Sequence, residues 1–354
     1  MFIFDIYRVD IYLSRKIFIL CLFPFISYFP SCFGLLTRDG LACRLPHTME
    51  KAQLRWQPIL ILLILAMIWG GHMAAIKIAA RELPPLFMAG FRSLIASLCL
   101  FIWLKAKGIT LFPSKAVLVH GIVVGLFFGS EFALIYVGLG YTLASRTYIL
   151  LHTAPFFVAL EAHFFLKGDR LNPWKVAGLL LAFAGVVSLF IKEIGSFSLA
   201  TLAGDVMAIG AGLLWGSTTV YVKRFLAERT EPLQTLFYQV VFSAPQLLFM
   251  SMVLENLSQA RLWDLSWVTI FSLFYQCIIV AFLSYLVWFV LIHRYPVSLL
   301  HAFSFFTPVF GVFLSGALIL GEGIGVNLIL ALILVSLGMV LVNRQPRSGR
   351  GNAL

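Results

Sequence analysis

The chain has 354 residues, of which 61% are hydrophobic and 12% are charged, and its mean hydropathy is +0.98. This composition excludes a soluble globular domain and predicts an integral membrane protein. The net charge of +11 does not indicate nucleic-acid binding, because the basic residues lie between apolar runs, where they would face lipid head groups. The five cysteines include no CxxC pair, so no disulfide framework and no zinc site is expected.

The N-terminal segment 1–48 has no counterpart elsewhere in the chain. Residues 17–36 are apolar and follow a basic pair, but Pro24 and Pro30 interrupt them. They could form an additional span or a long signal-anchor, whereas no small-x-small motif follows that would indicate a cleaved signal peptide. The other interpretation is that translation starts at Met49, which would make this segment an upstream extension.

Ten apolar runs follow, each long enough to cross about 30 Å of hydrocarbon as a helix. The predicted spans cover residues 58–79, 84–104, 117–138, 145–166, 173–191, 202–222, 232–254, 267–292, 297–319 and 324–342. Strands of a closed barrel would be shorter and would alternate polar with apolar residues. The predicted fold class is therefore an all-α membrane protein with ten transmembrane helices.

The same landmarks occur twice along these spans. Trp69-Gly70, Lys77, Pro155, Gly168-Asp169 and Gly185 recur as Trp215-Gly216, Lys223, Pro308, Gly321-Glu322 and Gly338. The offset is 146 residues for the first landmarks and 153 for the later ones, so one short insertion separates two colinear copies. They predict a first repeat over 57–192, a second over 202–344 and a tail over 345–354. Internal duplication in an apolar chain is typical of secondary transporters.

The loop charges predict the orientation of the repeats. If the segment before the first span is cytoplasmic, fifteen Lys and Arg residues fall on the cytoplasmic side and five on the outer side. Both ends of the ten-helix core are then cytoplasmic, and the protein is a multi-pass protein of the cytoplasmic (inner) membrane. Each repeat has five spans, an odd number, so the second repeat enters the membrane inverted relative to the first.

The ordered motifs resemble the EamA family of the drug/metabolite transporter superfamily. The residues that carry the resemblance are Trp69-Gly70 with Lys77, Pro84-Pro85 with Arg92, Ala144-Ser145, Pro155 and Gly168-Asp169-Arg170. In the family the last triplet is more often Gly-Glu-Arg, and the second copy here reads Gly321-Glu322-Gly323. The resemblance covers roughly residues 57–344. It implies an inverted-repeat carrier of small polar or amphipathic metabolites, often outward-directed and often proton-coupled.

Four ionisable residues of the first repeat lie about 10–12 Å below the outer boundary, as judged at 1.5 Å per residue from the span ends. They are His72, Arg92, Glu131 and His152. A charge inside lipid costs at least ~2.5 kcal/mol, which makes these residues substrate-site candidates. Glu131 and His152 would carry the coupling proton, and Arg92 would hold an anionic group or neutralise Glu131. The alternative is a static Arg92–Glu131 ion pair, with the histidines hydrogen-bonded to backbone or serine.

The second repeat contributes aromatic and amide side chains to its spans. Trp215 and Trp69 occupy equivalent positions, and Gln239 aligns with Arg92 of the first repeat. Together with Tyr285, these residues predict a pocket with a charged wall from one repeat and an aromatic-amide wall from the other. Such a pocket suits an amino-acid-like or aromatic amphiphile.

Three further features have structural interpretations. Asp205 is expected to be an interfacial or capping residue at the start of its span. Pro155 and Pro308 each remove a backbone hydrogen bond and favour helix kinks. A stripe of small residues on the third span predicts close helix packing. The stripe consists of Gly121, Gly125 and Gly129.

The combined prediction is a secondary-active transporter, an exporter of small metabolites, working by alternating access with the lipid bilayer as its environment. An intramembrane enzyme is the main rival, but HExxH, GxSxG and CxxC motifs are absent, so no enzyme activity and no cofactor is expected. A membrane-embedded sensor or scaffold would need an attached soluble part. Substrate identity, coupling ion and homo-oligomerisation stay open.

Overall fold

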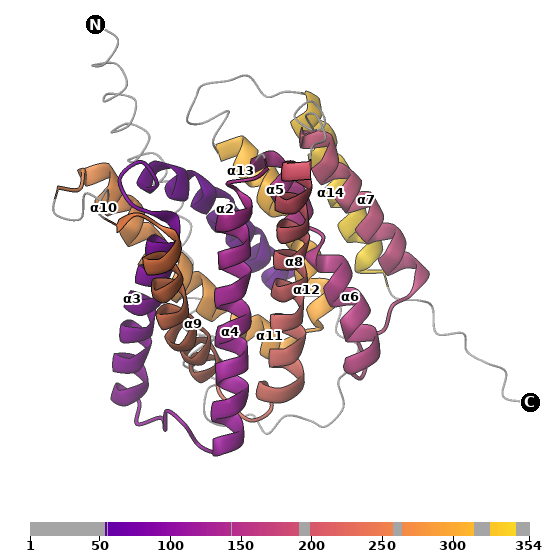
Figure 1. Cartoon of the computed structure of the whole chain (residues 1–354). Coiled ribbons are helices and arrows are strands. Elements are labelled where there is room, and N and C mark those ends of the chain that lie inside the picture. Colours follow the sequence, from indigo (N-terminus) through magenta and orange to yellow (C-terminus); the bar gives the residue numbers. More distant parts are fainter. Residues whose placement is uncertain are drawn as a thin grey trace, which may run out of the picture.

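The computed structural model describes residues 54, 56–142, 144–190, 199–257, 264–314 and 326–344, and these residues form helices and connecting turns without strands. The predictions for segments 1–48 and 345–354 and for Gly321-Glu322 lie outside these ranges. Figure 1 shows the helices as a bundle whose elements cross it from end to end. The helices are α2 Trp56–Ala79, α3 Pro85–Ala106, α4 Lys115–Gly138, α5 Ala144–Leu151, α6 Ala154–Phe165, α7 Pro173–Phe190, α8 Leu199–Tyr221 with η2 Val222–Leu226, α9 Pro232–Leu254, α10 Trp267–Phe274, η4 Tyr275–Ser284, α11 Tyr285–Arg294, α12 Val297–Ala302, η5 Phe303–Phe305, α13 Phe306–Val312 and α14 Val326–Val342.

Seven of these helical stretches are long and apolar enough to cross a membrane. Two shorter apolar stretches, 297–312 and 326–342, border residues outside the described ranges. Within the described residues each predicted span overlaps one helical stretch, including α8, which runs over Leu199–Tyr221. The outer surface carries many exposed large apolar side chains, among them Ile102, Phe164 and Phe249. Because water does not solvate such a surface favourably, it is the face expected to contact lipid.

Prolines set several helix boundaries and both predicted interruptions. Pro85 and Pro232 occupy the first position of α3 and α9, where the missing N–H has no intrahelical partner in any case. Pro155 lies at the start of α6, and the helix is interrupted between Leu151 and Ala154. In the second repeat a short 3₁₀ turn precedes the helix that contains Pro308. Both interruptions follow from the lost hydrogen bond and the ring clash of proline.

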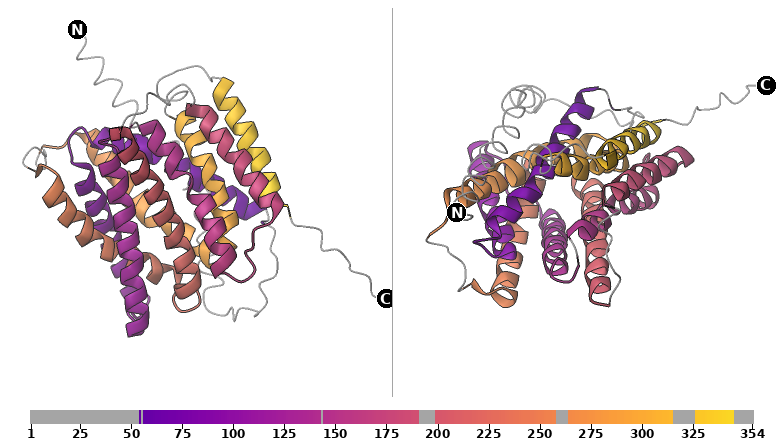
Figure 2. Two further views of the ribbon diagram at one scale, coloured as in Figure 1. Left: turned by 45° about the vertical axis from the view of Figure 1, so that its right-hand side comes forward. Right: turned by 90° about the horizontal axis from the view of Figure 1, so that it is seen from above.

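Contacts between the two halves of the chain come in reciprocal sets. The contact of α4 with α9 corresponds to the contact of α3 with η4. The contact of α4 with α8 corresponds to the contact of α2 with α10 and η4. Likewise, the contact of α6 with α8 corresponds to the contact of α13 with α2. In each pair, the first contact turns into the second when every span is replaced by the equivalent span of the other repeat. The remaining large contacts, α3 with α9 and α7 with α14, pair corresponding spans directly, and α7 and α14 lie side by side in Figure 2.

Glycines allow the closest of these contacts. A Cβ atom on Gly178 of α7 would lie 2.5 Å from the carbonyl oxygen of Gly338 on α14, and one on Gly338 would lie 2.6 Å from that of Gly178. A Cβ on Gly121 would lie 2.8 Å from the Tyr238 ring. The other two glycines of the α4 stripe, Gly125 and Gly129, approach α9 in the same way. The predicted packing role of this stripe is confirmed.

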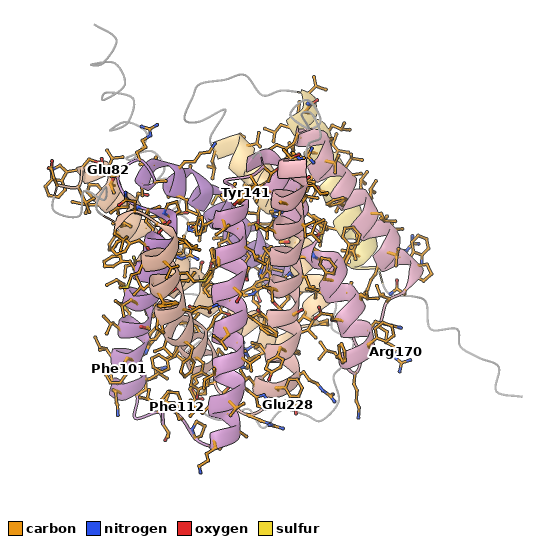
Figure 3. The ribbon with its side chains drawn as sticks, viewed as in Figure 1. Glu82, Phe101, Phe112, Tyr141, Arg170 and Glu228 are labelled. Atoms are coloured by element: carbon orange, nitrogen blue, oxygen red, sulfur yellow. The ribbon has the colours of Figure 1, made fainter. Side chains whose placement is uncertain are left out.

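The connecting segments alternate between the two ends of the bundle. Figure 3 places Glu82 and Tyr141 near one end and Phe112 and Glu228 near the opposite end. We call these the Tyr141 end and the Glu228 end. Glu82 and Tyr141 follow α2 and α4, whereas Phe112 and Glu228 follow α3 and the α8–η2 stretch. Successive helices therefore cross the bundle in opposite directions.

Candidate functional site

A cavity of about 130 Å³ lies within the bundle, with walls from α2, α4, the α5–α6 junction, α8 and α11. Seven of the eight predicted site residues line it: Trp69, His72, Glu131, His152, Trp215, Gln239 and Tyr285. Arg92 is the exception, because it is buried beside the cavity without forming part of its wall. The cavity therefore brings together residues that are up to 238 positions apart in the chain, since Trp69 and Thr307 both line it.

The described residues that line the cavity differ in exposure between its two ends. Its lining near the Tyr141 end includes Tyr136, Leu139 and Tyr148, which are partly exposed. At the Glu228 end the lining consists of Val222, Phe289 and Ile292, each at most 2% exposed. The described lining is therefore partly exposed at the Tyr141 end, which we call the open end, and buried at the Glu228 end, which we call the sealed end.

A lysine landmark of the second repeat reinforces the sealed end. Lys223 Nζ donates hydrogen bonds to the carbonyl oxygens of Ile292 (2.7 Å) and His293 (3.0 Å) in the last turn of α11. A cation at a helix C-terminus satisfies carbonyl groups that have no intrahelical donor. Lys223 thereby links the end of the α8–η2 stretch to the end of α11, next to the buried Ile292 side chain.

An aromatic cluster forms the middle of the cavity wall. The Trp69 ring lies 6.3 Å from Trp215, 5.2 Å from Trp288 and 6.1 Å from Tyr285 between centroids, in edge-to-face arrangements. Its indole N–H donates to Ser284 Oγ at 3.0 Å, which fixes the ring orientation. Edge-to-face packing is the arrangement that aromatic quadrupoles favour. The equivalent tryptophans of the two repeats thus meet at the centre of the site.

Arg92 is fully buried and does not line the cavity, and its Nε and Nη2 atoms have no hydrogen-bond partner among the described residues. Its Nη1 donates to His72 Nε2 at 2.9 Å, and its guanidinium lies 4.0 Å above the Phe132 ring. Phe132 lines the cavity, so its ring covers one face of the guanidinium. Within the described ranges Arg92 forms no salt bridge with Glu131, although the two charges interact electrostatically. The alternative of a static Arg92–Glu131 ion pair is therefore wrong.

Glu131 lines the cavity, and one of its carboxylate oxygens is buried without a hydrogen-bond partner among the described residues. The residue is 5% exposed, and its Oε2 atom has no partner among the described residues. Helix α4 holds it one residue before Phe132, directly after the glycine stripe that packs on α9. Buried polar groups in proteins are nearly always satisfied, so an unpartnered carboxylate facing a cavity indicates a binding or proton-transfer role.

The two predicted histidines differ in the group that they offer to the cavity. His152 Nδ1 lies 2.7 Å from the Tyr148 carbonyl oxygen, and because a carbonyl only accepts, Nδ1 carries the proton. The neutral ring then has an acceptor at Nε2, which has no partner in the part of the chain that the structure describes. His72 Nε2 accepts from Arg92 instead. Backbone bonding, the alternative for these histidines, therefore applies to His152 and not to His72.

Two site residues were missed by sequence reasoning, Trp288 and His301. His301 is fully buried, and its ring lies 5.0 Å from Trp215 and 5.2 Å from Trp288 between centroids. Its Nε2 is 2.8 Å from Thr219 Oγ1. The repeat offset of 153 residues aligns His301 with the cavity residue Tyr148, which was not predicted as a site residue either, so the repeat did not indicate His301.

Two further carboxylates within the helices, Asp205 and Glu161, have structural partners outside the cavity. Asp205 accepts from Thr142 Oγ1 at 2.8 Å and from Arg146 Nε at 3.1 Å, and so joins α8 to the segment that begins at α5. Glu161 accepts from Ser217 Oγ at 2.7 Å. Neither carboxylate lines the cavity. Asp205 thus links two helices, which extends the interfacial role predicted for it.

Comparison with known proteins gives matches along both halves of the chain. The EamA-like transporter family matches residues 56–191 and 202–344. The uncharacterized transporter YoaV of Bacillus subtilis is 26% identical, over 78% of this chain and 92% of that protein. An uncharacterized transporter of Archaeoglobus fulgidus is 30% identical, over 71% of this chain and 85% of that protein.

A protein of Escherichia coli named a probable amino-acid metabolite efflux pump is 25% identical, over 79% of this chain and 92% of that protein. Among solved structures, one crystal structure superimposes with a TM-score of 0.69. It is 21% identical and covers 81% of this chain and 96% of the other chain. At this identity the likeness shows a shared fold.

Proposed function

The chain belongs to the EamA-like transporter family, and on this basis we propose that it exports small metabolites, such as amino acids or amphiphilic compounds, across the cytoplasmic membrane. Family membership confirms the resemblance read from the sequence, and the protein is an integral membrane transporter. Export as the direction is supported by the printed name of the Escherichia coli relative. The observation that carries the proposal is the cavity between the two family repeats, with an unpartnered carboxylate in its wall.

The proposed topology is ten transmembrane helices arranged as two inverted repeats, 57–192 and 202–344. The reciprocal packing of the two halves supports this, because a two-fold relation exchanges corresponding spans. The odd number of spans per repeat makes that two-fold lie in the membrane plane. The loop charges support a cytoplasmic location for the Glu228 end and for both ends of the core.

The proposed mechanism is secondary-active transport by alternating access. The structure corresponds to a state in which the cavity is open at the Tyr141 end, the outer end in this topology. Loading from the cytoplasm requires the opposite state, in which Val222 and Ile292 separate and the Lys223 contacts with α11 break. Inverted repeats provide two such states because each repeat can adopt the conformation of the other.

The proposed roles follow the geometry of the cavity. Trp69, Trp215 and Tyr285 form the apolar contact surface for substrate, and Gln239 and His72 supply polar contacts at the wall. Arg92 positions His72 and offsets part of the cost of burying the Glu131 charge. We assign the coupling proton to Glu131 and His152, because both residues line the cavity and each has a buried polar atom without a partner among the described residues.

Proteoliposomes containing the purified full-length chain test this function. A panel of amino acids and related metabolites is loaded inside or outside the vesicles, with and without an imposed pH gradient. We expect saturable movement of at least one compound, faster when the gradient is present. Absence of protein-dependent movement for the whole panel, in either direction, would contradict transport by this cavity.

A further inference from the structure

The equivalent lysines of the two repeats have different surroundings. At the sealed end, Lys223 donates to the carbonyl oxygens of Ile292 and His293 at 2.7 and 3.0 Å. Lys77 lies in the last turn of α2, toward the open end, and its side chain is exposed without a partner among the described residues. The two lysines occupy corresponding positions of the repeats, 146 residues apart. Their different contacts therefore come from the different packing of the two ends.

The carbonyl groups that Lys223 binds also have equivalents in the first repeat. The offset of 153 residues relates Ile292 and His293 to Leu139 and Gly140. The helices that follow, α12 and α5, begin in the same register. Leu139 is the residue at which α4 ends, and no described residue donates a hydrogen bond to its carbonyl oxygen or to that of Gly140. The end of α4 therefore offers the same two acceptors as the end of α11, without a cation.

The neighbours of these groups line the two ends of the cavity. The residue before each lysine belongs to the lining, and Val222 at the sealed end is 0% exposed, whereas its equivalent Ile76 is 9% exposed. Ile292 is 1% exposed, whereas its equivalent Leu139 is partly exposed. The lysine is thus bound at the end where the lining is buried and unbound at the end where the lining is exposed.

We propose that Lys77 donates to the carbonyl oxygens of Leu139 and Gly140 when the open end closes, in the way that Lys223 holds the sealed end. The inference rests on the alternating access of the proposed function and assigns a residue to the state open to the cytoplasm. Inverted repeats exchange conformations between the two states, so a contact at one end predicts the equivalent contact at the other. A cation at a helix C-terminus is favourable in either position. The two lysines therefore stabilise opposite states.

Cysteine labelling of the full-length chain tests this assignment. Leu139→Cys and Ile292→Cys report the two ends, each in a chain whose five native cysteines are replaced by alanine. The quantity measured is the ratio of labelling at Ile292→Cys to labelling at Leu139→Cys. Methionine replaces lysine because it has a similar length but no charge and no donor. We expect Lys223→Met to raise the ratio, and Lys77→Met added to it to lower the ratio again, each by at least about three-fold.

Three further variants serve as controls. Lys77→Arg keeps a cation with N–H donors and is expected to keep the wild-type ratio. Lys115→Met removes an exposed lysine from the first residue of α4 and is expected to leave the ratio unchanged. Lys223→Leu provides a second background, in which the effect of Lys77→Met should be the same. A purely structural role for Lys77 would lower stability without shifting the ratio against the effect of the Lys223 substitutions.

The outcomes separate this inference from the proposed function. A ratio that neither Lys223 substitution raises, or that Lys77→Met does not lower in those backgrounds, would overturn the assignment of Lys77. The comparison needs no substrate, so it can fail while transport in proteoliposomes is intact. Absence of any protein-dependent transport would instead overturn the proposed function.

Discussion

Glu131→Gln abolishes transport driven by a pH gradient while the protein stays folded; this is the largest functional effect that we expect from one substitution. Glutamine has nearly the same size and shape, but its amide neither takes up nor releases a proton. Because Glu131 Oε2 has no partner among the described residues, the substitution breaks no hydrogen bond at that atom. We expect at least a ten-fold loss of the gradient-driven rate, which corresponds to ~1.4 kcal/mol or more.

The rate is measured in proteoliposomes with an imposed pH gradient, at equal amounts of monodisperse protein. Glu161→Gln serves as the control, because this carboxylate binds Ser217 and does not line the cavity. The control should keep the wild-type dependence on the gradient. A Glu131→Gln protein that still responds fully to the gradient would remove Glu131 from the coupling mechanism.

Asp169→Ala is expected to give the largest loss of stability, without altering the cavity. Asp169 is 2% exposed and accepts from the Ser298 backbone N–H at 2.9 Å, from Ser298 Oγ and from Lys175 Nζ at 2.6 Å. It thereby joins the loop before α7 to the first turn of α12, across the two repeats. Removing one member of a buried ion pair leaves the other charge uncompensated, at a cost of about 3 kcal/mol.

The measurement is the unfolding temperature of the purified protein in detergent, together with ligand affinity of the folded fraction. Asp264→Ala is the matched control, because Asp264 is exposed, and it should leave the unfolding temperature nearly unchanged. Affinity should be retained in both variants, since neither residue lines the cavity. An Asp169→Ala protein as stable as the control would show that this contact does not hold the repeats together.

The helical architecture was predictable because its determinants are local. Apolar run length sets the helices, and prolines mark several of their boundaries, as at Pro85, Pro155 and Pro232. The repeated pair of a glycine and an acidic residue, Gly168-Asp169 in the first repeat, could be recognised in the sequence. The structural role of its acidic residue could not be predicted from the sequence. Only the folded chain shows that Asp169 reaches the start of α12 in the other repeat. Contacts of this kind depend on which loops meet at one end of the bundle.

The depth of the candidate site residues along their helices was predictable from the sequence, but the direction in which their side chains point was not. Distances along spans place His72, Arg92, Glu131 and His152 in one layer, and three of them line the cavity. Depth along a helix does not fix which way a side chain faces. Arg92 was therefore predicted to contact the substrate, although the Phe132 ring covers its guanidinium.

His301 was missed for a different reason. The second repeat was predicted to contribute aromatic and amide side chains, and an imidazole without a charged neighbour has no electrostatic signature in the sequence. Its importance comes from packing between Trp215 and Trp288, which the sequence order does not reveal.

Side-specific cysteine labelling tests alternating access through this cavity most directly. Leu139→Cys and Ile292→Cys are introduced separately into a chain whose five native cysteines are replaced by alanine. Leu139 lies at the open end of the cavity and Ile292 at the sealed end. We predict that any condition that raises labelling at Ile292 from the cytoplasmic side lowers labelling at Leu139 from the outer side. Labelling that rises and falls together at both positions, or an Ile292→Cys that is never labelled while transport proceeds, would contradict the mechanism.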